Sequence, residues 1–343
     1  MRALIDLQKK LVPDLLEVMQ QRYSILHSVD LFQPIGRRGL AENANLTERN
    51  VRSEIDFLNE QGLILVTTKG MYITKEGKII LDQLAEFMSE IAGLNVLEKQ
   101  IKDKLHVKDI IIVPGNSDRY EWVKQEMGKA CIAFLKKVIK ANHTIAVTGG
   151  TTMAAVAEAM TPLTKEDSYL FVPARGGIGE KAENQANTIV AEMAKGAKGD
   201  YRLLYVPDPL SESAYQTIIN EPTINETLNQ IKGANVILHG IGDAFTMAER
   251  RKTPESIAKK LKENKAVSEA FGYYFNAMGS IVHKVRTVGI QLEDLASIDY
   301  VITIAGGESK GKAIASYFQQ GKSDLLITDE AAAKQILRED PFK

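Results

Sequence analysis

Cysteine is almost missing from this 343-residue sequence. The single one, Cys131, stands among apolar residues of a predicted helix, where we expect a small buried hydrophobic residue. It has no partner for a disulfide within the chain, so we expect a reducing compartment. Long apolar runs are missing too, because Asp6, Lys9 and Lys10 interrupt the stretch MRALIDLQKKLV. We therefore expect no signal sequence, no membrane span and a cytoplasmic location.

Net charge is nearly absent as well. The 43 basic and 44 acidic residues give a formal charge of -1, which provides no general attraction to nucleic acid. DNA binding would therefore need a local basic surface. The five histidines show neither the spacing of metal ligands nor that of a catalytic triad, so we expect no metal site.

The first 75 residues have the pattern of a winged helix. Apolar spacing predicts a helix over 12–31, a second in IGRRGLAENA, and a third in NLTERNVRSEIDFLNEQGLI, with Thr47 as its N-cap and Gly62 as its stop. Two short strands follow, LILVTT and MYITKEG. Lys69-Gly70 joins them, and the glycine supplies the positive φ of a tight hairpin. We predict a winged-helix DNA-binding domain over 1–75.

The third helix is the predicted recognition helix. The N-terminal half of such a helix enters the major groove, and Arg49 and Arg52 share one face there. Arginine can read guanine with two hydrogen bonds, while flanking cations contact phosphates. Alternatively, these are solvated arginines on a protein-interaction domain. The residues expected nearest to DNA are Arg37, Arg38, Thr47, Glu48, Arg49, Asn50, Arg52, Ser53 and Lys69.

A helical seam is predicted between residues 80 and 105, within a linker assigned to 76–105. Its apolar positions recur at intervals of three and four residues, which is typical of paired helices. They are Ile80, Leu84, Phe87, Ile91, Leu94, Leu97, Ile101 and Leu105. The seam predicts a homodimer or homotetramer, and a dimer suits an operator with two half-sites. Alternatively, the helix packs on the C-terminal domain of its own chain.

The segment 106–343 has the pattern of a Rossmann-like α/β domain with a parallel sheet. Short apolar runs that mostly end in glycine or proline alternate with helical stretches. The six runs are DIIIVPG, TIAVTGG, YLFVPARGG, YRLLYVPDP, NVILHGIGD and YVITIAGGE. Ligands bind beyond the C-terminal ends of such strands. We therefore expect one pocket formed by VTGGTT, ARGGIGEKAENQAN, GIGDAFTMAERR and AGGESKGKA.

The residue types in these loops are typical of phosphate binding. A first phosphate is expected at the glycines and threonines of VTGGTT, with a lysine from GGESKG, and a second anionic group at an arginine pair. A glutamine and a glutamate would meet the hydroxyls between them. Alternatively, the glycines only make turns and the arginines only face solvent. The expected residues are Gly149, Gly150, Thr151, Thr152 and Lys310, then Arg175 with Arg250 or Arg251, then Gln185 and Glu269.

A winged helix joined to TGGTT, ARGG and GGESKGKA loops resembles the SorC-type, DeoR-like sugar-binding transcriptional regulators. The resemblance extends to LQKKLVPDLLEVMQQRY and QPIGRRGLAE, and so covers essentially the whole chain. It implies a repressor of a glycolytic operon whose C-terminal domain is similar to sugar-phosphate isomerases and deaminases and binds fructose 1,6-bisphosphate. It also implies one phosphate site at Gly149, Gly150, Thr151, Thr152 and Lys310, another at Arg175, Gln185 and Arg250, and, more weakly, a role for Glu269.

An enzyme with an appended winged helix is the alternative. Enolisation needs a carboxylate base beside the sugar carbon, and Glu180, Glu183 and Asp243 are available. The acidic loop expected of the deaminases is not evident at ARGGIGEK. GGTTMA lacks the P-loop lysine and GGIGEK lacks the dinucleotide glycine spacing, so nucleotide hydrolysis is not expected. We therefore expect a sensor with no catalytic residue and no cofactor.

Overall fold

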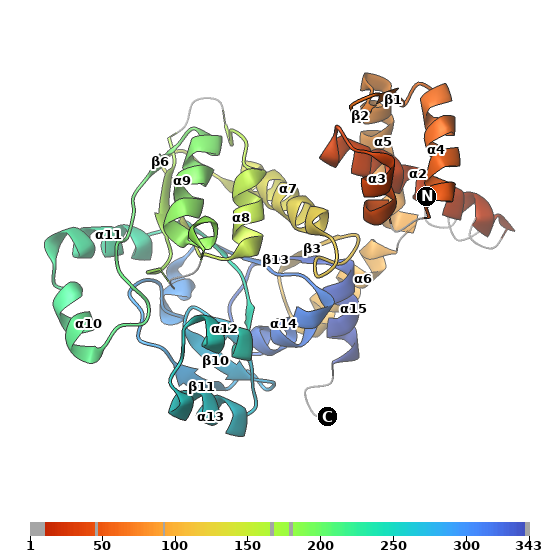
Figure 1. Ribbon diagram of the computed structural model, residues 1–343. Helices are drawn as coiled ribbons and strands as arrows, with labels where there is room; N and C mark the ends of the chain where they lie inside the picture. Colours follow the sequence, from red (N-terminus) through yellow and green to blue (C-terminus); the bar gives the residue numbers. More distant parts are fainter. Residues whose placement is uncertain (1–10, 45–46, 92, 165–167, 178–180, 340–343) are drawn as a thin grey trace. The chain divides into compact units, whose positions relative to one another are not determined.

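The fold is that of a computed structural model (Figure 1). The chain divides into two compact units, residues 1–95 and 96–343. The described residues are 11–44, 47–91, 93–164, 168–177 and 181–339.

The N-terminal unit is a winged helix, as predicted. Three helices are followed by a two-stranded antiparallel hairpin and a fourth helix. Val51, Ile55 and Leu58 are the buried face of the third helix. The elements are α2 (Pro13–Phe32), α3 (Arg37–Ala44), α4 (Glu48–Glu60), β1 (Ile64–Thr67), β2 (Gly70–Ile73) and α5 (Lys75–Ile91).

Gly70 is required at the wing for two reasons. Its φ of +135° is unfavourable for other residues, and a Cβ there would lie 3.1 Å from the backbone nitrogen and oxygen of Ile35. Ile35 in turn exchanges backbone hydrogen bonds with Met71 of β2. The glycine therefore lets the hairpin lie directly against the chain that enters α3.

The continuous helix predicted over 80–105 is wrong. Helix α5 ends at Ile91, Gly93 has a φ of +73°, and a separate helix α6 (Leu94–Leu105) follows. Gly93 has the left-handed conformation in which helices commonly stop. The linker assigned to 76–105 is thus two helices, and the division at residue 95 leaves most of α6 in the C-terminal unit.

The apolar seam is used within the chain. Leu84 and Phe87 of α5 pack against Leu16 of α2. In α6, Ile101 and Leu105 are buried. The same helix is tied to the C-terminal unit, because Glu98 accepts a hydrogen bond from the Ile112 backbone at 2.9 Å and Lys104 donates to the Leu337 carbonyl at 3.2 Å. The spacing therefore reflects intrachain packing and does not by itself indicate an oligomer.

The C-terminal unit is built on a seven-stranded sheet whose pairings are all parallel, which confirms the predicted fold class (Figure 1). Its order is β3-β13-β12-β7-β4-β5-β6. The strands are β3 (Asp109–Val113), β4 (Thr144–Val147), β5 (Leu170–Pro173), β6 (Asp200–Tyr201), β7 (Val236–His239), β12 (Tyr300–Ile304) and β13 (Leu325–Asp329). Side chains from α7 (Glu121–Val138), α8 (Thr151–Glu158) and α9 (Ala186–Ala197) form the main core with this sheet.

A second, antiparallel sheet was not predicted from the sequence. It has the order β11-β10-β9-β8 and packs against α14 (Gly311–Phe318) and α12 (Ala244–Arg250). Its strands are β8 (Gly242–Asp243), β9 (Ala266–Ala270), β10 (Tyr273–Asn276) and β11 (Ile281–Lys284). The remaining elements are η1 (Ala182–Asn184), α10 (Glu212–Ile218), α11 (Pro222–Lys232), α13 (Glu255–Glu263), η2 (Glu293–Ser297), η3 (Glu308–Lys310) and α15 (Glu330–Arg338).

One predicted strand is much shorter than expected. The run YRLLYVPDP begins in β6, which spans only Asp200–Tyr201. Beyond it, the Asn187 side-chain amide donates to the Leu204 carbonyl at 3.1 Å and accepts from the Leu204 N–H at 3.0 Å. A side chain thus replaces the neighbouring strand as the partner of this backbone.

Candidate functional site

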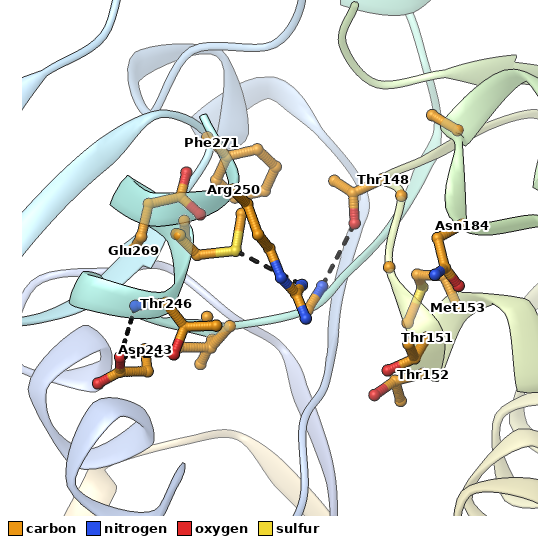
Figure 2. A pocket seen from close by; sticks show the side chains of 18 of the residues that line it. Thr148, Thr151, Thr152, Met153, Asn184, Asp243, Thr246, Arg250, Glu269 and Phe271 are labelled. Carbon is orange, nitrogen blue, oxygen red and sulfur yellow. Dashed lines mark hydrogen bonds between the residues drawn. The ribbon is translucent and has the colours of Figure 1, made fainter. Parts of the chain in front are cut away.

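A pocket of about 440 Å³ opens beyond the C-terminal ends of β4, β5 and β7 (Figure 2). The pocket lies within the C-terminal unit, at the edge of the sheet where parallel α/β folds bind their ligands. Loops far apart in the sequence meet here, including the antiparallel sheet at β9. All of the predicted effector residues line the pocket, namely Gly149, Gly150, Thr151, Thr152, Arg175, Gln185, Arg250, Glu269 and Lys310.

The two glycines of VTGGTT have different structural roles. A Cβ on Gly149 would lie 2.7 Å from the Asn184 carbonyl oxygen, so Gly149 permits a close approach of two backbones. Gly150 has a φ of +118° and is the N-cap residue of α8. The first N–H groups of α8, beginning at Thr151, have no acceptor in their own helix and carry the positive end of its dipole. This arrangement favours an anion.

Lys310 is placed by a second glycine turn. The buried Asp329 carboxylate accepts hydrogen bonds from the Gly307 N–H at 2.7 Å and the Ser117 N–H at 2.9 Å. Asp118 accepts from the Ser309 N–H at 2.7 Å and the Ser309 hydroxyl at 2.9 Å. These bonds hold the turn that presents Lys310 to the pocket.

Electrostatics lower the pKa of Lys310. Burial is the main cause, Asp118 opposes it, and the positive charges of Arg250 and Lys124 add to the lowering. A bound phosphate would raise the pKa of Lys310 again and so favour its charged ammonium form. Arg250 and Lys310 therefore act on one another across the pocket, which suits a ligand that carries more than one negative charge.

The neighbouring arginines Arg250 and Arg251 have opposite environments. Arg250 is exposed, ends α12 and lines the pocket. Arg251 has a side chain only 1% exposed and does not line the pocket. Of the two arginines that the sequence offered, only Arg250 therefore faces the pocket. The alternative interpretation of both as surface charges is wrong for Arg251, which is buried.

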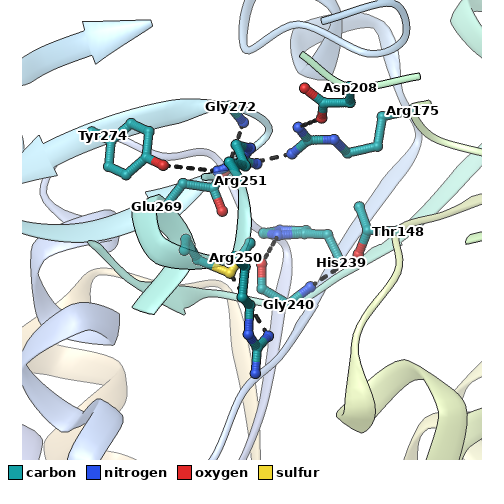
Figure 3. Close-up of polar contacts among 11 residues, drawn as sticks. Thr148, Arg175, Asp208, His239, Gly240, Arg250, Arg251, Glu269, Gly272 and Tyr274 are labelled. Atoms are coloured by element: carbon teal, nitrogen blue, oxygen red, sulfur yellow. Dashed lines mark hydrogen bonds and ion pairs between the residues drawn. The ribbon is translucent and has the colours of Figure 1, made fainter. Parts of the chain in front are cut away.

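Arg175, predicted from the sequence to bind a second anionic group, is paired with carboxylates within the protein. It is 6% exposed and is paired with Asp208 and, at 3.3 Å, with Glu269 (Figure 3). Glu269 also pairs with Arg251 at 2.8 Å. The ion-pair cluster of Arg175, Asp208, Glu269 and Arg251 is balanced in charge, so Arg175 presents little net positive potential to a second phosphate.

The pKa of Glu269 shows how strongly this cluster is coupled. Burial alone would raise it, but the charges of Arg251 and Arg175 and a hydrogen bond from the Gly272 N–H lower it overall. Asp208 was not identified as a functional residue from the sequence, because its partner Arg175 is 33 residues away along the chain. Arg251 was named only as an alternative anion clamp, and its pairing with Glu269 was not predicted.

Of the carboxylates considered for the enzyme alternative, the structure describes Asp243, which lines the pocket, and Glu183. Asp243 caps α12 by accepting from the Thr246 N–H and hydroxyl, both at 2.9 Å. Glu183 is exposed on η1 and is not among the residues that line the pocket. Glu180 lies outside the described residues. Within the described part of the chain, no group of three or more histidine, cysteine or acidic side chains could hold a metal ion.

The residues predicted to contact DNA lie at the start of α3, at the N-cap and in the first half of α4, and on the wing. The Thr47 hydroxyl accepts from the Asn50 N–H at 3.3 Å, which confirms the predicted N-cap. Arg38 forms an exposed ion pair with Glu42 at 3.3 Å. All of the predicted DNA contacts are exposed, namely Arg37, Arg38, Thr47, Glu48, Arg49, Asn50, Arg52, Ser53 and Lys69. Exposed arginines and a lysine are therefore available for DNA on a chain with almost no net charge.

The chain belongs to a family of sugar-binding transcriptional regulators. Residues 89–338 match the Sugar-bind family of sugar-binding domains, and residues 18–88 match the CggR N-terminal DNA binding domain. These matches place a DNA-binding domain and a sugar-binding domain in one chain.

Particular relatives are similar over nearly the whole chain. The central glycolytic genes regulator of Priestia megaterium is 54% identical over 99% of each chain, and that of Bacillus subtilis is 53% identical over 99% of this chain and all of the relative. A SorC family transcriptional regulator from Enterococcus faecalis, solved by crystallography, is 45% identical with a TM-score of 0.67, covering 70% of this chain and 99% of that one.

The full-length sorbitol operon regulator SorC from Klebsiella pneumoniae shares the fold. It is 17% identical, with a TM-score of 0.67 over 89% of this chain and 94% of that one. Because the relatives are named as regulators and a DNA-binding domain is present, this chain is a transcriptional regulator and not an enzyme. Among the described residues, no helix has both the length and the apolar character needed to cross a bilayer.

Proposed function

We propose that this chain represses glycolytic genes and that fructose 1,6-bisphosphate is the inducer that releases it from operator DNA. The names of the two central glycolytic genes regulators described above, each more than 50% identical to this chain, support the choice of genes. The observation that carries the choice of ligand is the convergence of Lys310, Arg250 and the N-terminus of α8 on one pocket. We further propose that it acts in the cytoplasm, where operator DNA and sugar phosphates meet.

In this proposal the two phosphates have different partners. One is bound by the α8 N–H groups, the hydroxyls of Thr151 and Thr152, and Lys310. The other is bound by Arg250. Arg175 is already neutralised by Asp208 and Glu269, so it shapes the pocket wall rather than supplying the second charge.

The sugar between the phosphates would meet uncharged and acidic acceptors. Gln185 and Glu269 line the pocket, and a carboxylate that has lost its proton can only accept hydrogen bonds. It would therefore favour ligand hydroxyls and repel a phosphate. This separation of cationic and acidic walls supports a bisphosphate with a polyhydroxylated centre.

Induction requires that the ligand bind the DNA-incompatible state more tightly than the DNA-bound state. A coupling free energy of about 1 to 3 kcal/mol would weaken operator binding roughly 5- to 150-fold. By reciprocity, operator DNA would weaken sugar binding by the same factor. This gives the proposal two independent readouts.

The test is titration of operator DNA with and without saturating fructose 1,6-bisphosphate. Thr152→Ala and Arg250→Ala should each reduce the response to the sugar while leaving operator affinity without sugar unchanged. Lys312→Ala is a matched control, because Lys312 is an exposed cation just beyond Lys310 that does not line the pocket. It should respond like wild type.

Equal operator affinity across saturating bisphosphate would contradict the inducer role. The same samples should be assayed for turnover of the sugar phosphate. Product formation that Thr152→Ala abolishes would return the chain to the enzyme class.

We also propose a homodimer or homotetramer, because an operator with two symmetric half-sites favours two recognition helices related by the same symmetry. Light scattering with and without the bisphosphate measures the mass directly. Substitution of Leu84 is not a clean test, because Leu84 packs inside the N-terminal unit. A monomeric mass at the concentrations that saturate the operator would contradict the proposal.

A further inference from the structure

The two carboxylate oxygens of Glu269 have unequal surroundings. Oε1 accepts hydrogen bonds from the Gly272 N–H at 2.6 Å, Arg251 Nη2 at 2.8 Å and Arg175 Nη1 at 3.3 Å. Among the described residues, no donor contacts Oε2. Oε2 lies beside Gly242, another residue of the pocket wall, 3.6 Å from the position that a Cβ there would take.

Arg251 is fixed from its other side. Its Nη1 donates to the Tyr274 hydroxyl at 3.0 Å, while Nη2 donates to Glu269 (Figure 3). The side chain is 1% exposed and does not line the pocket, so it cannot touch a ligand directly. It can act on a ligand only through Glu269.

We infer that Arg251, braced by Tyr274, is a positioning residue that sets ligand specificity. By binding Oε1 it orients the Glu269 carboxylate so that Oε2 faces the pocket as an acceptor for a hydroxyl of the sugar. It also keeps Glu269 ionised, and an ionised carboxylate cannot donate a hydrogen bond to a phosphate. This inference rests on the proposed bisphosphate ligand and adds how its hydroxyls are recognised.

Two bisphosphates separate this role from simple stabilisation. Fructose 1,6-bisphosphate carries hydroxyls, whereas hexane-1,6-diol bisphosphate has two phosphates at the ends of a six-carbon chain and no hydroxyl. The ligands also differ in flexibility, but that difference is the same for every variant, so the change in the ratio of their affinities between variants measures hydroxyl recognition. Binding of both should be measured by calorimetry to the full-length protein as wild type, Glu269→Gln, Arg251→Lys and Tyr274→Phe.

Wild type should prefer the sugar. Arg251→Lys and Glu269→Gln should reduce that preference about ten-fold, because a hydrogen bond to a charged acceptor is lost or misdirected. The affinity of Arg251→Lys for the hydroxyl-free bisphosphate should stay within about two-fold of wild type, because lysine keeps the positive charge and residue 251 does not line the pocket. Tyr274→Phe keeps the ring and removes only the brace, so its loss of preference should be smaller.

Equal weakening of both ligands in Arg251→Lys would overturn the inference, since it would reveal a structural role only. If Arg251→Lys does not fold, an unchanged preference in Tyr274→Phe overturns it instead. Wild type that binds both ligands equally would remove the hydroxyl role while leaving the bisphosphate proposal intact. Wild type that binds neither would reject both.

Discussion

The recognition helix and the effector pocket handle positive charge in opposite ways. Arg49 and Arg52 of α4 lie exposed in solvent. At the pocket, Arg175 and Arg251 are buried and paired with Asp208 and Glu269. Exposed positive charges contribute most of their interaction free energy only when a polyanion binds, and salt weakens that interaction. Buried charges are already paired within the protein, so they fix the shape of the pocket wall and the orientation of its side chains before any ligand binds.

The largest expected effect comes from breaking the buried side of this comparison. Arg251→Met leaves the Glu269 carboxylate without its shortest ion-pair partner. Loss of one member of a buried pair typically costs about 3 to 5 kcal/mol. We expect that loss in the free energy of unfolding of the C-terminal unit, measured by denaturant titration.

Its neighbour along the chain is the control. Arg250→Met removes an exposed arginine of the same helix end, and should change the unfolding free energy by less than about 0.5 kcal/mol. Similar losses in the two variants would mean that burial does not distinguish these arginines.

The next effect depends on pH and on His239. This side chain is fully buried between the Phe271 and Tyr317 rings and bonds Thr303 through Nε2 at 2.8 Å. Burial lowers its pKa from 6.5 to about 4, against small opposing effects of the Gly240 carbonyl and the Glu269 charge. Below pH 6.5 the His239 side chain therefore binds a proton in the unfolded chain but not in the folded chain.

Stability should fall as the pH drops from 6.5 toward 4, by about 3 kcal/mol from this group alone. The check is a series of denaturant titrations across that range. His239→Gln should reduce the slope of the unfolding free energy against pH by the equivalent of about one bound proton. Glu269, whose pKa is lowered, adds its own loss only below its ordinary value of 4.5, so the two contributions separate in pH. An unchanged slope in His239→Gln would show that groups other than His239 bind the protons taken up on unfolding.

The smallest effect on stability, but a clear effect on binding, is expected at the exposed surface. Arg52→Ala should weaken operator binding by about 1 to 3 kcal/mol if Arg52 reads a base, with almost no change in unfolding. Lys69→Ala at the wing should instead weaken all DNA sequences about equally and reduce the salt dependence by about one phosphate. Titrations of operator and unrelated DNA at several salt concentrations distinguish these outcomes. Coincident curves for Arg52→Ala and wild type would remove Arg52 from the interface.

Local chemistry explains which features the sequence could predict. The Thr47 N-cap, the Gly70 turn and the glycines before α8 depend on residues close together in the chain, and each was found. The pairing of Arg175 with Asp208 depends on tertiary packing that leaves no periodic signal. The seam shows a further reason: spacing predicts that one face of a helix is buried, but not which partner covers it.

The break at Gly93 has an evolutionary consequence. The buried clusters on its two sides are made from separate residues, 16–88 before it and 113–327 after it. A recombination event at this joint would therefore transfer a complete DNA-binding unit or a complete sugar-binding unit without exposing the core of either. Such a joint allows one sugar-binding domain to be inherited with different DNA-binding domains, and the operator and the inducer of a regulator can then change in separate steps.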